Sequence, residues 1–211
     1  SLRRQRQMCI RDRPVPIVLF IYFISLISMT MSGNNVMKNL NWMPHIGMNF
    51  NLYVDGLGLL FSLLITGIGS LVVLYSIGYL SKSEQLGNFY CYLLLFMGAM
   101  LGVVLSDNFI ILYLFWELTS FSSFLLISFW REKKASIYGA QKSLIITVLG
   151  GLSMLGGIIL LSLATDTFSI QAMISKASDI QNSPFFILAM ILFMIGAFTK
   201  SAQVPLSLIH I

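Results

Sequence analysis

Six long apolar stretches, separated by short polar segments, dominate the pattern along the chain. They are Val15–Met31, Gly56–Leu80, Phe89–Leu105, Phe109–Trp130, Ser143–Ala164 and Pro184–Pro205, each 17 to 25 residues long. At about 1.5 Å per residue, such helices reach roughly 25–37 Å and cross the ~30 Å hydrocarbon core of a bilayer. Because backbone groups in lipid must bond within their own segment, the pattern predicts an all-α transmembrane bundle of about six spanning helices.

The polar segments predict how these spans are connected. Residues 34–53 suit either an extramembrane hairpin or an interfacial segment. Residues 166–183 predict a short surface helix, because apolar residues recur there at helical spacing. Asp107 and Asn108 form a tight turn, in which either side chain can cap the following helix.

Composition supports the membrane interpretation. The chain has 211 residues, of which 57% are hydrophobic and 10% charged; a soluble domain is about a quarter charged. This excludes a disulfide-rich secreted scaffold, a nucleic-acid-binding domain and a disordered tail. The two cysteines, Cys9 and Cys91, suggest neither a metal site nor a disulfide, and we expect Cys91 to be a small buried hydrophobe.

The formal net charge of +5 belongs mostly to one short tail. Residues 1–13 hold five Arg and one Asp, and they resemble read-through of a sequencing adaptor. Residues 206–211 have the same character, so we set both ends aside and expect the transmembrane domain to be residues 14–205 of a longer chain. A signal peptide is the weaker alternative, because no small-residue cleavage site follows Met31.

The distribution of basic residues predicts the orientation. The segments after the second and fourth spans carry five Lys or Arg, whereas those after the first, third and fifth carry two. The more basic side is expected to face the cytoplasm. Small residues predict close helix packing, at Gly98, Gly102, Gly150, Gly151, Gly156 and Gly157.

Glu117 is an ionisable residue in the middle of an apolar span. It lies eight residues, or about 12 Å, into the fourth span, where a charge costs about 2.5–3.5 kcal/mol on insertion scales. Tyr113 and Ser120 share its helical face and predict a polar stripe. Such residues are usually functional, although a Glu that only pairs with a neighbouring helix is the alternative.

Lys200 is the second such residue, and it precedes Pro205 by five positions. The proline predicts a helix break just after Lys200, and a charge at a broken helix is a pattern of ion sites in transporters. A lysine also changes its protonation state readily when it is desolvated. The alternative is an amine that extends to the cytoplasmic end of the helix.

A carboxylate and an amine on separate helices can couple, so that neutralising one changes the proton affinity of the other. Glu117 and Lys200 therefore predict a proton-translocating pair. Lys142 either extends this relay or serves as an ordinary interfacial anchor. Because no phosphate loop, metal cluster or nucleophile triad appears, we expect no cofactor and no catalytic residues in an enzymatic sense.

Four segments together make the sequence resemble a known family: Asp55-Gly-Leu-Gly-Leu-Leu-Phe-Ser, Ser106-Asp-Asn, Leu114-Phe-Trp-Glu-Leu-Thr-Ser and Gly196-Ala-Phe-Thr-Lys-Ser-Ala-Gln-Val-Pro205. They resemble the antiporter-like subunits shared by respiratory complex I and the Mrp cation/proton antiporters. Asn41-Trp-Met-Pro-His and the residues from Leu80 to Tyr90 are similar to the A-type subunits of Mrp (Mnh) complexes. By this resemblance, Glu117 is the family's essential glutamate and Lys200 its lysine in a broken helix.

The resemblance implies an N-terminal fragment of a subunit that exchanges Na⁺ for H⁺ across the cell membrane, together with other subunits of its complex. After Pro205 the family usually has an aromatic residue and a His; here Ser207 stands at the His position, and His210 is no replacement. Two alternatives stay open. One is a proton-pumping subunit of an NADH:quinone oxidoreductase, and the other is a structural membrane subunit.

Overall fold

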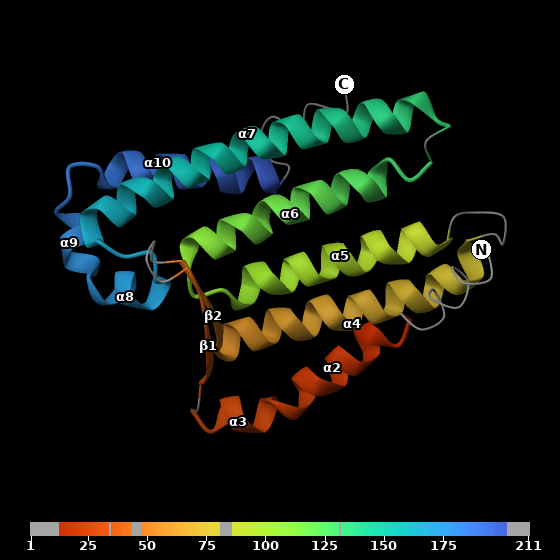
Figure 1. The fold of residues 1–211 in the computed structure, drawn as a ribbon, viewed down its shortest axis with the longest axis horizontal. Helices are drawn as coiled ribbons and strands as arrows, with labels where there is room; N and C mark the ends of the chain where they lie inside the picture. The colour runs from red at the N-terminus through yellow and green to blue at the C-terminus, as the bar shows by residue number, and fades with distance from the viewer. Residues whose placement is uncertain (1–12, 34, 44–47, 81–85, 131, 202–211) are drawn as a thin grey trace.

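The computed structural model describes residues 13–33, 35–43, 48–80, 86–130 and 132–201. The elements in chain order are α2 (Val15–Ser25), α3 (Ile27–Met31), β1 (Val36–Met43), β2 (Met48–Val54), α4 (Gly56–Tyr79), α5 (Leu86–Leu105), α6 (Phe109–Ile127), α7 (Lys134–Thr165), α8 (Ile170–Ser175), α9 (Ala177–Gln181) and α10 (Phe186–Lys200). In Figure 1 the long helices lie side by side, with the hairpin, α8 and α9 at one end of the bundle.

The predicted all-α membrane bundle is confirmed. In the described part of the chain, four helices, α4 to α7, are long and apolar enough to cross a membrane, and they contain 24, 20, 19 and 32 residues. The remaining apolar helices are shorter. The first predicted span is divided into α2 and α3 at Leu26, whose N–H bonds to the carbonyl of Phe23 three residues back, at 3.2 Å. This tightened turn changes the direction of the chain at that point.

The predicted ends differ by three residues at the start of α5 and at the end of α6, and by more in the last two spans. The fifth span was expected to begin at Ser143, but α7 begins at Lys134. Its first nine residues include lysines and other polar residues, so an apolar window does not detect them although they are helical. The sixth span is represented by α10, which has 15 residues and ends at Lys200. Pro205 lies outside the described residues.

The two strands β1 and β2 pair antiparallel, which agrees with a hairpin, one of the two possibilities predicted for this part of the chain. Val36 pairs with Val54, and Leu40 pairs with Phe50. The expected surface helix at 166–183 is instead two short helices, α8 and α9, which meet at Lys176. The Lys176 amine donates a 2.8 Å hydrogen bond to the carbonyl of Thr165, so the junction is attached to the end of α7.

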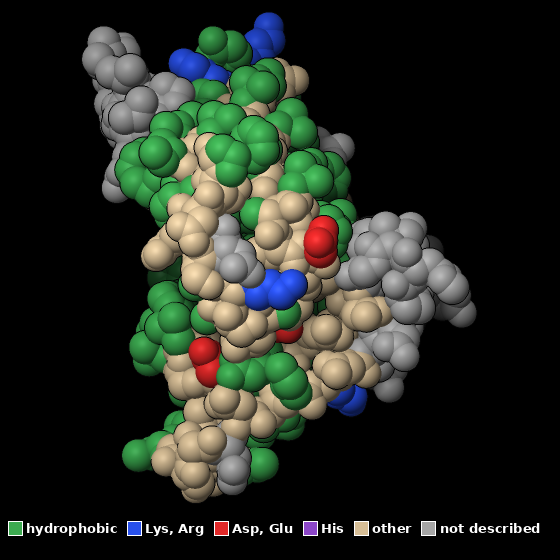
Figure 2. Space-filling model, turned by 90° about the vertical axis from the view of Figure 1, so that its left-hand side faces the viewer, with side chains coloured by type: hydrophobic (Ala, Val, Ile, Leu, Met, Phe, Trp, Pro, Cys, Tyr) green, Lys and Arg blue, Asp and Glu red, His purple; other side chains and the backbone are tan. Residues whose placement is uncertain are grey.

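The turn at 106–108 holds this end of the bundle together. Asn108 caps α6, accepting hydrogen bonds from the N–H groups of Ile110 and Ile111. Of the two candidate caps for this helix, Asn108 is therefore the one used, and Asp107 has a different role. Its carboxylate accepts from the Ser169 hydroxyl at 3.0 Å and the Gln171 N–H at 3.1 Å, so it caps α8 from a distant part of the chain. Figure 2 shows this end of the molecule, where polar and charged groups lie between hydrophobic side chains.

Helix contacts place α6, α7 and α10 together. Both α6 and α10 pack against α7, and α5 packs against the other side of α6. A Cβ at Gly102 would overlap the ring of Phe115, whereas no described residue lies within 4 Å of that position at Gly98. Only one member of the predicted glycine pair is therefore at a close contact. Cys91, expected to be buried, is exposed on α5.

Candidate functional site

Glu117 and Lys200 come together where α6, α7 and α10 meet. Glu117 lies near the middle of α6, and Lys200 is the last residue of α10. Both residues are half-buried. The two ionisable residues that the sequence singled out thus come from helices that are separated along the chain by the whole of α7.

The amine of Lys200 is bound by α6. It donates hydrogen bonds to the hydroxyls of Thr119 and Ser120, each at 2.6 Å, and to the backbone carbonyl of Trp116 at 3.2 Å. It also lies 5.2 Å from the centre of the Trp116 ring. An ammonium group has three N–H donors, so these three oxygens satisfy it completely. The amine points across to α6 and does not extend along α10 towards an aqueous end.

The carboxyl group of Glu117 is turned towards α7. Its Oε1 is buried and has no hydrogen-bond partner in the described part of the chain. A Cβ added at Gly151 would overlap this oxygen, so the missing side chain provides the space that the carboxyl occupies. A buried polar atom without a partner costs about 1–3 kcal/mol, which makes this arrangement unusual for a purely structural group.

Glu117 and Lys200 do not form a direct ion pair. They nevertheless interact electrostatically. Residues three apart on a helix are neighbours, about 5–6 Å apart at Cβ. The Lys200 amine, which is bonded to Ser120, therefore lies about one helical turn from Glu117. The site therefore contains an acid and a base that are close together but have different immediate partners.

Two adjacent glycines of α7 shape the site. Gly151 makes room for Glu117, and a Cβ at Gly150 would overlap the hydroxyl of Thr199, next to Lys200 on α10. From the sequence these glycines indicated only close packing. Their position beside a titratable group was missed, because nothing along one chain shows which neighbouring helix a glycine faces.

The other predicted residues lie apart from this centre. Lys142 is exposed on α7, nine residues before Gly151 and so roughly 13 Å from it along the axis. It has no hydrogen bond or ion pair within the described ranges. In the predicted polar stripe, Ser120 binds Lys200, while Tyr113 is half-buried one turn before Glu117. His45, Ser207 and His210 lie outside the described residues.

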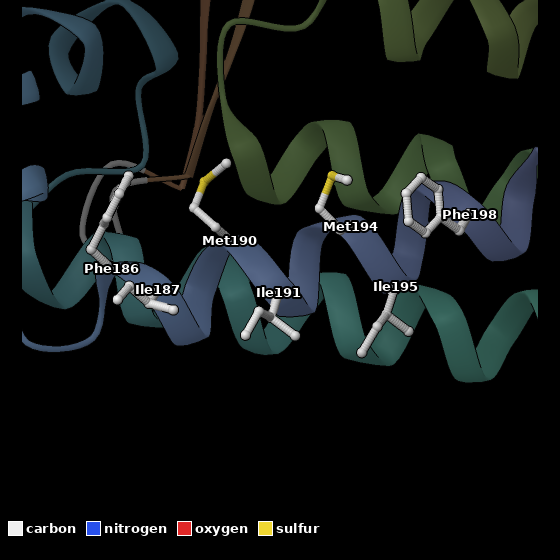
Figure 3. Close-up of a pocket in the computed structure, with 7 residues that line it drawn as sticks. All are labelled: Phe186, Ile187, Met190, Ile191, Met194, Ile195 and Phe198. Carbon is white, nitrogen blue, oxygen red and sulfur yellow. The ribbon is translucent and has the colours of Figure 1, made fainter.

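An apolar depression lies elsewhere, along the outer face of α10. Figure 3 shows its lining, which consists of Phe186, Ile187, Met190, Ile191, Met194, Ile195 and Phe198. None of these side chains titrates, so the depression offers no proton or cation chemistry. Among the described residues, no group of three or more His, Cys, Asp or Glu is placed to hold a metal ion.

Comparisons with family models cover most of the chain. Residues 42–90 match the model described as NADH-ubiquinone oxidoreductase (complex I), chain 5 N-terminus. Residues 106–208 match the model described as NADH:quinone oxidoreductase/Mrp antiporter, transmembrane. The second match includes Glu117, Lys200 and the three α6 residues that bind the lysine.

The similar proteins agree with the family models, because they are also antiporter subunits. The chain is 85% identical over 192 residues to the A1 subunit of the Na⁺/H⁺ antiporter of Staphylococcus aureus strains JH9 and Newman. The match includes 91% of this chain but 24% of each relative, so the chain spans about a quarter of their length.

Two solved structures share the fold. The Mrp complex from Dietzia sp. DQ12-45-1b matches with a TM-score of 0.85 and 28% identity, over 96% of this chain and 22% of that chain. An archaeal membrane-bound sulfane sulfur reductase matches with a TM-score of 0.77 and 20% identity, over 97% of this chain and 31% of that chain. The second likeness is one of fold.

Proposed function

Because the chain belongs to the family of antiporter-like membrane subunits shared by NADH:quinone oxidoreductases and Mrp antiporters, we propose that it is part of the large subunit of a multisubunit Na⁺/H⁺ antiporter. In this proposal it exchanges sodium for protons across the cell membrane, together with the other subunits of its complex. The high identity to the A1 subunit supports an antiporter over a redox-driven pump.

One observation carries the proposal. In the middle of an apolar bundle, the buried Glu117 Oε1 has no hydrogen-bond partner among the described residues, and the amine of Lys200 lies one helical turn away. A charge held in low dielectric is costly unless it has a use or full pairing. Because the two groups interact, the arrival of a proton on one lowers the cost of releasing a proton from the other.

The proposed mechanism needs only these side chains. When Lys200 is protonated, its positive charge favours the ionised carboxylate of Glu117. When the lysine loses its proton or moves away, the carboxylate loses that support and takes up a proton. Alternation between these states moves a proton along α6. Lys142 stays a candidate for the cytoplasmic continuation of the path, with the role of interfacial anchor as its alternative.

The redox-driven alternative is favoured by one observation, the descriptions of the two family models, which name NADH:quinone oxidoreductase. Its membrane physics would be the same, with electron transfer in a partner complex supplying the energy. Membranes that contain the complete complex distinguish the two: an antiporter exchanges Na⁺ for H⁺ under an imposed gradient without any quinone-reducing activity.

The test uses the full-length subunit, expressed with its partner subunits in an antiporter-deficient strain. Glu117→Gln and Lys200→Ala should each lower Na⁺/H⁺ exchange in everted vesicles at least a hundredfold, while normal amounts of complex assemble. Glu132→Gln, at an exposed position, is the matched control and should exchange at the wild-type rate. Intact exchange with a reduced amount of complex would instead identify a purely structural role.

A further inference from the structure

We propose that Thr119, Ser120 and the Trp116 carbonyl form a dock, which holds the Lys200 amine away from Glu117 and gives this lysine two stations on α6. One station is the dock itself, where the structure has the amine. The other is an ion pair with Glu117, one turn away. The inference rests on the proposed function and assigns positioning residues to it.

The dock consists of buried and already oriented oxygens. Thr119 and Ser120 are 2% and 4% exposed. The Thr119 hydroxyl donates its own hydrogen to the Trp116 carbonyl at 2.7 Å, and the Ser120 hydroxyl donates to the same carbonyl at 3.4 Å. A hydroxyl that donates its hydrogen keeps lone pairs to accept another bond. Both oxygens therefore face Lys200 as acceptors without further rearrangement.

Another buried hydroxyl on the same helix shows that burial and backbone bonding alone do not create a site for the amine. Ser122 is 0% exposed, and its hydroxyl donates to the carbonyls of Leu118 and Thr119. Bonding back to the preceding turn is ordinary for serine in a helix. Within the described part of the chain, Ser122 bonds to no charged group, whereas Thr119 and Ser120 combine the same backbone bonding with a bond to the amine.

The partners of the amine make two stations possible. Neutral dipoles satisfy all three ammonium donors in the dock, and the carboxyl of Glu117 is left facing Gly151. An ion pair in low dielectric would otherwise be the strong default. Because the dock competes with that pair, the lysine can leave Glu117 without losing its hydrogen bonds. A two-state element of this kind is what an exchange cycle requires.

The dock makes a specific prediction for its removal. The double variant Thr119→Val with Ser120→Ala keeps the volume near the amine but removes both hydroxyl acceptors. Lys200 should then stay with Glu117, and the maximal rate of exchange should fall at least tenfold. The sodium concentration that gives the half-maximal rate should change less than twofold, because the proposal assigns these two hydroxyls to holding Lys200 and not to binding sodium.

The experiment compares four variants in the full-length subunit within its complex. The double variant should exchange slowly. Thr119→Ser, which keeps a hydroxyl at this position, should exchange within twofold of the wild-type rate, and Ser122→Ala should exchange at the wild-type rate. Each complex is quantified in the membrane, so that rates refer to assembled protein. Glu117→Gln, measured in parallel, reports on the proposed function itself.

Two results would overturn the dock. Wild-type exchange in the double variant, with Glu117→Gln inactive, would leave the proposed function standing and reject the two stations. An equal loss in Ser122→Ala and in the double variant would show a general packing effect, and it would reject the dock as well. Wild-type exchange in Glu117→Gln would instead reject the proposed function.

Discussion

Asp107 and Glu117 are both acidic residues packed inside this structure, yet their surroundings are opposite. Asp107 is 4% exposed, and its two carboxylate oxygens accept hydrogen bonds from the Ser169 hydroxyl and the Gln171 N–H. Its backbone groups bond to Asn51 and Ile170. Glu117, in contrast, has a buried oxygen with no donor among the described residues.

This difference distinguishes a carboxylate with a structural role from one that can change its protonation state or its partner. A carboxylate with all its acceptors satisfied is held in one place and one state, because any change breaks several bonds. A carboxyl with an unsatisfied oxygen has less to lose when it takes up a proton or a new partner. Burial by itself does not distinguish the two cases, since Asp107 is the more buried of the pair.

The sharpest way to break the comparison is to fill the space beside Glu117. Gly151→Ala would place a Cβ on Glu117 Oε1, so the carboxyl must move. We expect exchange to fall at least tenfold, equivalent to about 1.4 kcal/mol in the barrier. The rate per assembled complex in everted vesicles measures this. Gly156→Ala is the control, because its Cβ would meet Leu192 at an ordinary 3.5 Å.

Removing the carboxylate of Asp107 should lower the stability of the protein and leave the exchange rate unchanged. Asp107→Ala loses two hydrogen bonds to a charged group, at roughly 1.5 kcal/mol each, so we expect the free energy of unfolding to fall by about 3 kcal/mol. Thermal unfolding of the solubilised complex should occur at a lower temperature, while exchange per folded complex stays at the wild-type rate.

The control for this variant is Asp166→Asn. Asp166 is exposed at the end of α7 with a φ of 53°, a conformation that asparagine also adopts readily. Its unfolding temperature should match that of the wild type. If Asp107→Ala unfolds normally but loses exchange, the distinction between the two acids fails.

The smallest effect is expected at Lys142. Because its side chain is exposed and lies roughly 13 Å from Gly151 along α7, Lys142→Gln should change the exchange rate less than twofold. The same vesicle assay measures it. A tenfold loss would place Lys142 in the relay and would remove its interpretation as an interfacial anchor.

Much of the fold follows from hydropathy, and the reasons are local. α4 ends within one residue of its predicted span, because Asp55 accepts a hydrogen bond from the Gly58 N–H at its start and the chain turns extended at Leu80. The start of α7 was missed, because its first residues are polar as well as helical. Apolarity locates the part of a helix in lipid, and the helix itself can be longer.

The site was only half predictable. Glu117 and Lys200 stood out, because each is a charge within an apolar span. The bonds from Lys200 to Thr119 and Ser120 depend on how α10 crosses α6, which no spacing along the chain specifies. The cap formed by Asp107 on α8 was missed for the same reason, since more than sixty residues separate the partners.

The position of Lys200 at the last residue of α10 has an electrostatic consequence of its own. The aligned peptide dipoles of a helix leave about half a negative charge at its carboxyl end, which favours a nearby cation by roughly 0.3–1 kcal/mol. The backbone of α10 therefore adds to the stabilisation that the three oxygens of α6 give the ammonium group.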